Sequence, residues 1–307
     1  MVSIDCITYN HEKYIADALE GMLMQKTDFA FEILVHDDAS TDNTARIISQ
    51  YQELYPKVIK PIFQKTNQVS QGVRRIGHRF NHSRAMGKYV AICEGDDCWT
   101  DPHKLQKQVE YMEAHPDCMF CFHNAQVVDH IERVNERVVV PWLPENKCFY
   151  KGKDGMYTAG DLQLLGYIPT ASFMYRKVCL DNPPDWFYDA PVADNAIKLI
   201  ASSFGYAYFI DEPMSIYRYN VPNSATTRWR GESVQSRIGR TEQFIAMLDK
   251  FNEWSDYRYK EQIEYSKLTW EIQGLIIRDG RSRMDKEKVR RYIDLLSGQA
   301  RLKYYLL

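Results

Sequence analysis

A short apolar run that ends in three carboxylates constrains the fold of this chain more than any other feature. Residues 89–93 read YVAIC, and Glu94, Asp96 and Asp97 follow directly. The run has the length and composition of a buried strand, so the acids mark its exposed C-terminal end. In open α/β sheets, ligands bind beyond the carboxyl ends of the strands. Crowded carboxylates repel one another and divalent ions prefer oxygen ligands, so one interpretation is a site for Mn²⁺ or Mg²⁺.

The same segment also fits an ordinary acidic turn. Asp101 and Pro102 come shortly after the acids, and they suit the N-cap and the first position of a helix. Short acidic patterns recur by chance. This segment alone therefore leaves the metal site and the acidic turn both open.

Strands and helices alternate along the first part of the chain. Apolar residues alternate with polar ones over 2–8, whereas those between 15 and 23 follow helical spacing. The same patterns predict strands over 31–35, 58–63 and 89–93, and helices over 47–54 and after Pro102. Pro61 weakens the third of these strands. Strands that alternate with helices imply a mostly parallel sheet with helices on both faces.

The second half of the chain is predicted to extend this sheet and then to become helical. Strands are expected over 118–128 and 170–176, a helix over 193–201, and a pair of strands over 206–219. The stretch over 129–160 is charged and then rich in Pro, Gly and Lys, which suggests an excursion from the sheet or a flexible loop over the site. Beyond about residue 230 the pattern is helical, so we expect an appended helical bundle or hairpin.

Composition narrows the class of protein. The 307 residues are 45% apolar and 26% charged, with a formal net charge of −2, which is typical of a soluble globular protein and does not indicate nucleic-acid binding. No apolar run approaches the length of a membrane-spanning helix and the chain has no basic leader, so we expect a cytoplasmic protein. Cys118 and Cys121 form the one close pair among seven cysteines, and they predict no zinc or redox site.

Two further acidic positions could complete a polar cleft with the three carboxylates. Asp37 and Asp38 follow the strand over 31–35, so they are expected at the same edge of the sheet. Asp194 lies at the start of the helix over 193–201. Each has a plain alternative, because Asp is an ordinary turn and capping residue and is favoured near helix N-termini.

Several motifs in a fixed order resemble glycosyltransferase family 2, which has the GT-A fold. They are Thr8-Tyr9-Asn10, HDDASTDNT at 36–44, AMGKYVAICEGDDCW at 85–99 with DPHKLQKQ after it, ADNAIKL around Asp194, and SIYRYN at 215–220. NQVSQG at 67–72 is similar to the version in bacterial members whose acidic motif is E-G-D-D-x-W. Four ordered motifs are far more specific than any one of them.

The resemblance implies an α/β fold with a Rossmann-like, mostly parallel sheet flanked by helices. It covers roughly residues 1–225, with a nucleotide-sugar-binding half over 1–100 and an acceptor half over 101–225. The helical region over 226–307 would be appended to this domain, and the resemblance says nothing about its role.

The resemblance also implies roles on the donor side of the site. The residues that would bind the nucleotide are Thr8, Tyr9, Asn10, Asp38, Glu94 and Gly95. Among them, Asp38 would accept a hydrogen bond from the base, and Glu94 would face the ribose. Asp96 would be the direct ligand of Mn²⁺ or Mg²⁺, and Asp97 would support the site.

On the acceptor side, the resemblance implies that Asp194 is the general base. Asp97, Asp185 and Asp189 are the other candidates for that role. Trp99 could offer an apolar face to the sugar or the acceptor, although an aromatic residue beside a strand end more often belongs to the packing.

One departure from the family pattern concerns the metal site. Many relatives have a His after the Tyr-Arg pair near residue 218, whereas here Tyr217-Arg218 is followed by Tyr219. The protein would then supply fewer metal ligands. Arg218, Arg228 or Arg230 could compensate by binding the phosphates, since a guanidinium group suits phosphate oxygens.

The predicted function is the inverting, metal-dependent transfer of a sugar to an acceptor hydroxyl in bacterial polysaccharide or surface-glycan synthesis. The expected donor is a UDP-sugar, and the expected acceptor is a glycan or a lipid-linked glycan. A nucleotidyltransferase is one alternative, and it would release pyrophosphate. A non-catalytic protein that binds a sugar nucleotide or a glycan is another.

The C-terminal region carries a local excess of positive charge. Between residues 278 and 303 there are nine Lys or Arg and four Asp or Glu. A solvated helix face is the favoured interpretation. The alternative is peripheral contact with the anionic inner face of a membrane, where lipid-linked acceptors are found.

Overall fold

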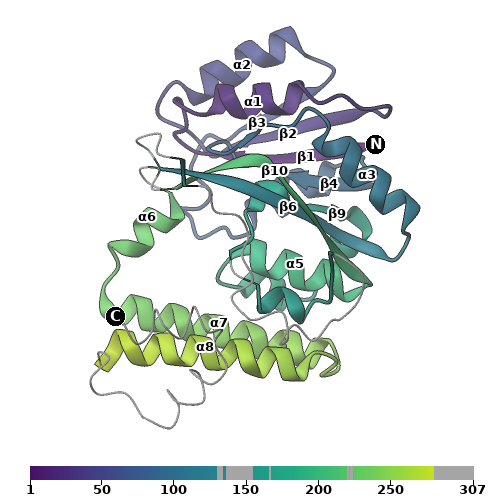
Figure 1. The fold of residues 1–307 in the computed structure, drawn as a ribbon. Coiled ribbons are helices and arrows are strands. Elements are labelled where there is room, and N and C mark those ends of the chain that lie inside the picture. The colour runs from purple at the N-terminus through teal and green to yellow at the C-terminus, as the bar shows by residue number, and fades with distance from the viewer. Residues whose placement is uncertain (130–133, 136–154, 166, 220, 222–223, 280–307) are drawn as a thin grey trace.

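The computed structural model describes most of the chain, namely residues 1–129, 134–135, 155–165, 167–219, 221 and 224–279. These residues form one ten-stranded sheet with helices packed on it, and a long helical hairpin at one end (Figure 1). The α/β class predicted from the sequence is confirmed.

The first four long strands form a parallel half-sheet. β3 (Ile59–Phe63), β2 (Phe31–Asp37), β1 (Val2–Thr8) and β4 (Tyr89–Ile92) lie side by side in that order. β1 therefore has a parallel neighbour on each side. The order of the strands reverses at this point, and open α/β sheets bind ligands where the order reverses.

The second half of the sheet mixes strand directions. β9 (Met174–Arg176) runs antiparallel to both β4 and β6 (Cys118–Asp129). β10 (Tyr206–Tyr219) runs parallel to β6, and β5 (Cys98–Trp99) pairs with it in the antiparallel direction. The sheet is thus mostly parallel, as predicted, with antiparallel pairs where these later strands join it.

Helices bury apolar faces against both sides of the sheet. α1 (Ile15–Leu23), α2 (Thr44–Leu54) and α3 (Lys104–Ala114) contribute to the core on one side. α5 (Ala193–Ser203) contributes to the core on the other side. Successive residues of β4 alternate between the two cores, which is what the two-residue period of a strand requires.

The C-terminal helices share the second of these cores. α6 (Ala225–Arg230) leads to α7 (Val234–Trp254) and α8 (Lys260–Asp279), and the last two pack side by side (Figure 1). Phe244 and Phe251 of α7 are buried in the core that α5 helps to form. The predicted helical hairpin is present, and its apolar side chains join it to the sheet.

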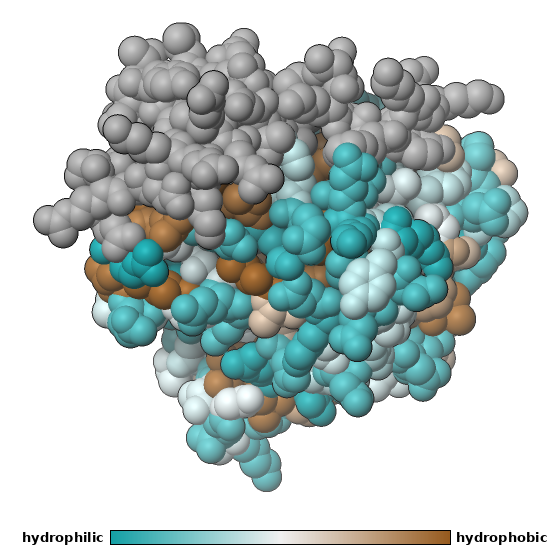
Figure 2. Space-filling model, turned by 90° about the horizontal axis from the view of Figure 1, so that it is seen from below, coloured by the Kyte–Doolittle hydropathy of each residue, from teal (hydrophilic) through white to brown (hydrophobic). Residues whose placement is uncertain are grey.

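Figure 2 shows the molecule from below, and the described residues on this face mix hydrophilic and hydrophobic side chains. No helix among the described residues is long and apolar enough to span a membrane. Almost all of the basic segment over 278–303 lies outside the described part of the chain, so the two interpretations of that segment remain predictions.

The predicted start of α3 was wrong by two residues. The helix begins at Lys104, because Asp101 holds a turn in front of it instead of capping it. The carboxylate of Asp101 accepts a hydrogen bond from the amide of His103 at 2.7 Å and pairs with Lys107 at 2.7 Å. Pro102 therefore belongs to the turn.

Two later predictions also need correction. The expected strand pair over 206–219 is the single strand β10, whose register against β6 shifts around Pro213. Residues 170–172 form a short 3-10 helix, so only the end of the predicted strand over 170–176 becomes β9.

Most of the stretch over 129–160 lies outside the described residues, so the flexible loop predicted there remains a prediction. Two short strands within it are described. β7 (Val134–Asn135) pairs with β6, and β8 (Met156–Tyr157) pairs with β10.

Candidate active site

The carboxyl ends of β1, β2 and β4 meet at one edge of the sheet. Main-chain hydrogen bonds join the residues that follow β2 and β4 to the end of β1. The amide of Asp38 donates to the carbonyl of Thr8 at 3.0 Å, and the amide of Gly95 donates to the carbonyl of Ile7 at 2.9 Å. The structure therefore brings together the three segments that the sequence placed at strand ends.

Side chains join the loop after β1 to the loop after β2. Asn10, which has a positive φ of 56°, donates its amide to the Ser40 hydroxyl at 2.9 Å, and its side-chain oxygen accepts from the amide of Thr41 at 2.8 Å. Glu12 makes a matching pair of contacts, donating its amide to Asp42 and accepting from Asn43. Asn tolerates this left-handed conformation better than most residues, which explains its place in the loop.

Asp38 is buried, with 1% of its surface exposed, and its carboxylate organises a distant loop. One oxygen accepts from the amide of Gln68 at 2.7 Å and the other from the amide of Val69 at 3.2 Å. The predicted contact with a nucleotide base would therefore have to share a carboxylate that already binds the main chain. Tyr9, which is predicted to line the same nucleotide pocket, is solvent-exposed, with 39% of its surface accessible.

The acidic segment after β4 makes a tight turn over β1. The amide of Asp97 donates to the carbonyl of Glu94 at 3.1 Å. Gly95 is required here because a Cβ at that position would lie 2.6 Å from the Thr8 hydroxyl and 3.0 Å from Nδ1 of His11. The close approach of the two strand ends thus depends on a residue without a side chain.

Charge accumulates in this turn. The pKa of Glu94 is raised well above its ordinary value, first by burial and then by the neighbouring carboxylates of Asp96, Asp97 and Asp194. Burial and the charge of Asp96 likewise raise the pKa of Asp97. A cation placed among these groups would remove the repulsion that raises both pKa values.

Asp96 and His11 fit a divalent ion that takes its other ligands from a bound diphosphate. Among the described residues, no group of three or more His, Cys, Asp or Glu side chains is arranged to bind a metal by itself. Asp96 is partly exposed at the edge, with an imidazole, that of His11, 3.8 Å from one of its oxygens. A bound diphosphate would have to supply the remaining oxygen ligands.

Arg218 connects the acidic turn to β10 and α1. Its guanidinium donates to the carbonyl of Asp96 at 3.0 Å and pairs with Asp17 of α1 at 2.7 Å, while its amide donates to the carboxylate of Asp97 at 3.2 Å. The supporting role of Arg218 and its role as a phosphate ligand both stay predictions. Arg228 is exposed on α6.

Trp99 lies in the core and not at the edge of the site. It is 1% exposed, its indole N–H donates to the carbonyl of Ala171 at 2.8 Å, and the ammonium of Lys104 lies 3.8 Å from its ring centre. The packing alternative is therefore correct, because no face of the ring is free for a sugar.

Asp194 occupies the second position of α5. The N-cap of that helix is Val192, so Asp194 is not the capping residue. Its carboxylate accepts from the amide of Asn195 at 2.6 Å, and its charge contributes to the raised pKa of Glu94. The role of Asp194 as the general base stays a prediction. Asp189, by contrast, pairs with Lys250 and has a side chain that is 74% exposed.

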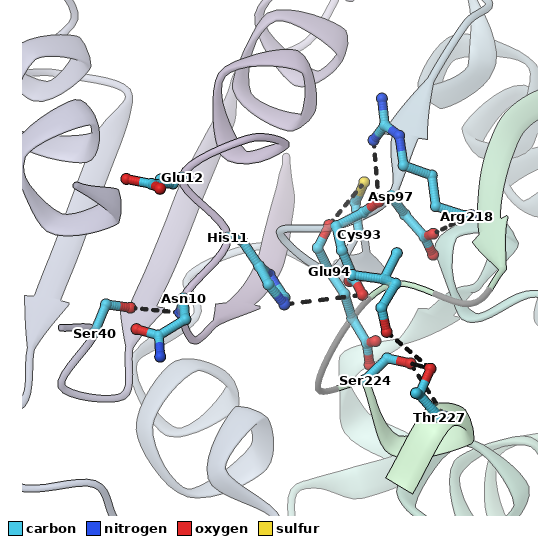
Figure 3. Close-up of polar contacts among 12 residues, drawn as sticks. Asn10, His11, Glu12, Ser40, Cys93, Glu94, Asp97, Arg218, Ser224 and Thr227 are labelled. Carbon is cyan, nitrogen blue, oxygen red and sulfur yellow. Dashed lines mark hydrogen bonds and ion pairs between the residues drawn. The ribbon is translucent and has the colours of Figure 1, made fainter. Parts of the chain in front are cut away.

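Sequence reasoning missed two residues of this region. His11 directly follows the Thr8-Tyr9-Asn10 motif and points toward the acidic turn that carries Glu94 (Figure 3). Arg75 donates to the carbonyls of Phe187 and Ala190, just before α5. The position of His11 beside a motif was a usable signal, whereas nothing near Arg75 in the sequence indicates its partners.

Comparison with known proteins identifies related chains. A model of the family described as glycosyl transferase family 2 matches residues 3–180. An uncharacterised glycosyltransferase of Nostoc is 30% identical over 80% of this chain and 74% of its own length. An uncharacterised protein of Mycobacterium tuberculosis is 47% identical over 41% of this chain, and the match spans only 36% of the mycobacterial protein.

Solved structures share the fold. TarS of S. aureus in complex with UDP-GlcNAc has a TM-score of 0.66 at 19% identity, with 96% of this chain and 79% of that chain covered. The mannosyltransferase PcManGT of Pyrobaculum calidifontis, in complex with GDP-Man and Mn²⁺, has a TM-score of 0.54 at 17% identity, with 98% and 82% covered. The GT-A-like architecture predicted from the motifs is confirmed by this likeness.

Proposed function

The chain belongs to glycosyltransferase family 2, and on that premise we propose that it transfers a sugar from a nucleotide sugar to an acceptor hydroxyl. The observation that carries the proposal is the acidic turn of Glu94, Asp96 and Asp97, which closes over the end of β1 at the edge where the order of the strands reverses. The acidic turn has the E-G-D-D-x-W form of some bacterial members, which favours a role in polysaccharide or surface-glycan synthesis.

The donor would bind across the ends of β1, β2 and β4. Tyr9 would lie against the base and Asp38 beside it, with the 67–69 loop held by the same carboxylate. Glu94 would face the ribose. We favour UDP as the nucleotide, and the likeness to TarS with bound UDP-GlcNAc supports that choice. The donor-binding half would end near residue 100, just after the acidic turn. The acceptor-binding half would follow over 101–225.

Asp96 would hold the divalent ion, Mn²⁺ or Mg²⁺, together with diphosphate oxygens of the donor. When bound, such an ion stabilises the negative charge that develops on a departing diphosphate. Arg218 would keep Asp96 in place, since its guanidinium binds the carbonyl of Asp96. Asp97 would anchor the turn to β10, since its carboxylate accepts from the amide of Arg218.

Inversion needs one displacement at the anomeric carbon, in which the acceptor oxygen forms its bond as the diphosphate leaves. Asp194 would accept the proton of the acceptor hydroxyl, because it is a carboxylate at the start of α5 whose charge acts on Glu94. The acceptor itself would be a glycan or a lipid-linked glycan.

The product distinguishes this proposal from its alternatives. The full chain is incubated with UDP-sugars, Mn²⁺ and a mixture of glycan acceptors, and the released phosphates are separated by chromatography. Sugar transfer releases UDP. Release of a sugar 1-phosphate from the UDP-sugar, or of pyrophosphate in a parallel incubation with UTP and a sugar 1-phosphate, would instead identify a nucleotidyltransferase. Donor that binds but stays intact would identify a binding protein.

A further inference from the structure

We propose that His11 is the second protein ligand of the divalent ion that Asp96 would hold. The inference rests on the proposed function and adds a residue to its metal site. His11 would supply from the β1 loop the imidazole that the chain lacks after Tyr217-Arg218.

The spacing of the two side chains supports a shared ion. Nε2 of His11 and Oδ2 of Asp96 are 3.8 Å apart. This distance is too long for a hydrogen bond, which requires about 2.7–3.2 Å. Two donors that each bind one ion at about 2.0–2.2 Å lie roughly 3 Å apart at a right angle and about 4.2 Å apart when opposite. The gap therefore fits an ion between the two groups better than it fits a direct contact.

The main chain around His11 fixes the position of its ring. The carbonyl of His11 accepts from the amides of Tyr14 and Ile15, both at 2.9 Å, at the entry to α1. The preceding residue, Asn10, is held in its left-handed conformation by the loop after β2. The side chain of His11 therefore leaves a rigid part of the backbone.

The orientation of the ring leaves one nitrogen for an ion. Nδ1 is buried, has no hydrogen-bond partner among the residues that the structure describes, and lies where a Cβ on Gly95 would approach to 3.0 Å. Nε2 is the nitrogen on the side of Asp96. Figure 3 shows the ring between the β1 loop and the acidic turn that carries Glu94 and Asp97.

An imidazole ligand has a consequence for the choice of ion. Carboxylate and phosphate oxygens bind Mg²⁺ and Mn²⁺ alike, whereas a nitrogen donor favours the transition-metal ion. We therefore expect a preference for Mn²⁺ over Mg²⁺ that depends on His11.

The test measures metal binding and does not depend on turnover. Mn²⁺ is titrated into the full chain at saturating UDP, and free Mn²⁺ is followed by electron paramagnetic resonance. Replacement His11→Ala should weaken Mn²⁺ binding by at least about 10–100-fold, which is the loss when a residue that only orients a metal ligand is replaced. The exposed His103 provides the matched control, and His103→Ala should leave the affinity for Mn²⁺ at the wild-type value. In the wild type, the pulsed spectrum should show coupling of Mn²⁺ to an imidazole nitrogen, and His11→Ala should lose it.

A second variant and a metal-free titration keep the outcomes distinct. His11→Asp should restore Mn²⁺ binding without the nitrogen signal and should reduce the preference for Mn²⁺ over Mg²⁺. If His11→Ala binds Mn²⁺ as the wild type does, the inference is wrong while the proposed function stands. Equal loss of UDP affinity with and without Mn²⁺ would also overturn it, since His11 would then bind the diphosphate. A wild type that forms no complex with Mn²⁺ and UDP would overturn the proposed metal use as well.

Discussion

The two sides of the candidate site are built differently. On the donor side, short-range contacts between neighbouring strand-end loops hold the functional residues, as between Asn10 and Ser40. On the acceptor side, Asp194 accepts a hydrogen bond from the next amide in its own helix, and the segment before that helix is held from a distance by Arg75. The difference suggests that changes on the donor side alter binding first, whereas changes on the acceptor side alter turnover first.

One segment connects the two sides. Its beginning is held by Asp38, which binds the amides of Gln68 and Val69. At its end, Arg74 donates to the carbonyl of Asp189 at 3.0 Å, and Arg75, with a positive φ of 60°, donates to the carbonyl of Phe187 at 2.7 Å. Residues 67–75 therefore link the carboxylate of Asp38 on the donor side to the segment before α5 on the acceptor side.

The largest effect is expected at Asp96, on the donor side. Replacement Asp96→Ala should abolish sugar transfer and remove the stabilisation by UDP that depends on Mn²⁺. The fold should survive, because Arg218 binds the carbonyl of Asp96 and not its side chain. Transfer assays and melting curves with and without Mn²⁺ check this. Unchanged metal-dependent stabilisation in the variant would remove Asp96 from the site.

The next largest effect is expected at Asp194, on the acceptor side. Replacement Asp194→Asn keeps an oxygen for the amide of Asn195 but removes the base, so turnover should fall by roughly 10²–10⁴-fold while UDP and metal affinity stay near the wild-type values. Asp189→Asn is the matched control and should remain active, since that carboxylate is exposed. Full activity of Asp194→Asn, with a stability loss of about 0.3–1 kcal/mol in Asp194→Ala from the lost interaction with the helix N-terminus, would assign Asp194 a purely structural role.

A smaller effect on binding is expected at Asp38. Replacement Asp38→Ala leaves the amides of Gln68 and Val69 without their acceptor and removes the carboxylate from the base pocket. UDP affinity should fall by about 1–3 kcal/mol, measured by calorimetry. If wild type and variant bind UDP and GDP equally well, the idea of a specific base site at Asp38 fails.

The smallest effect is expected at Arg75. Replacement Arg75→Lys keeps the charge but cannot reach the carbonyls of both Phe187 and Ala190 with one ammonium, so the free energy of unfolding should fall by about 1–2 kcal/mol. Turnover should fall more than UDP affinity does, because the segment before α5 positions Asp194. An equal loss of both would show that residues 67–75 act on the donor side as well.

Local patterns in the sequence predicted the parts of this molecule that depend on neighbouring residues. The strands over 2–8 and 89–93 follow from alternation and apolar composition, and the acids that end them follow from the same runs. The helix over 193–201 follows from its apolar spacing. The strand-end position of these acids was therefore accessible without a structure.

The errors arose where distant parts of the chain meet. Trp99 was a candidate for the site because it follows the acids, but β10 and Ala171 enclose it in the core. The pairing of Arg218 with Asp17 on α1 was also not accessible from the sequence. His11 was overlooked because its position opposite Asp96 depends on how β1 and β4 pair. No local pattern contains these contacts.

The account is tested most directly by the melting temperature of the wild-type chain with a panel of nucleoside diphosphates in Mn²⁺, Mg²⁺ or a chelator. A donor pocket at the acidic edge predicts that UDP stabilises the protein only when a divalent ion is present. At a concentration of about 100 times its dissociation constant, UDP should add roughly 2.7 kcal/mol to the free energy of unfolding. A panel in which no nucleoside diphosphate raises the melting temperature with either ion, or in which UDP does so equally in chelator, would contradict the account.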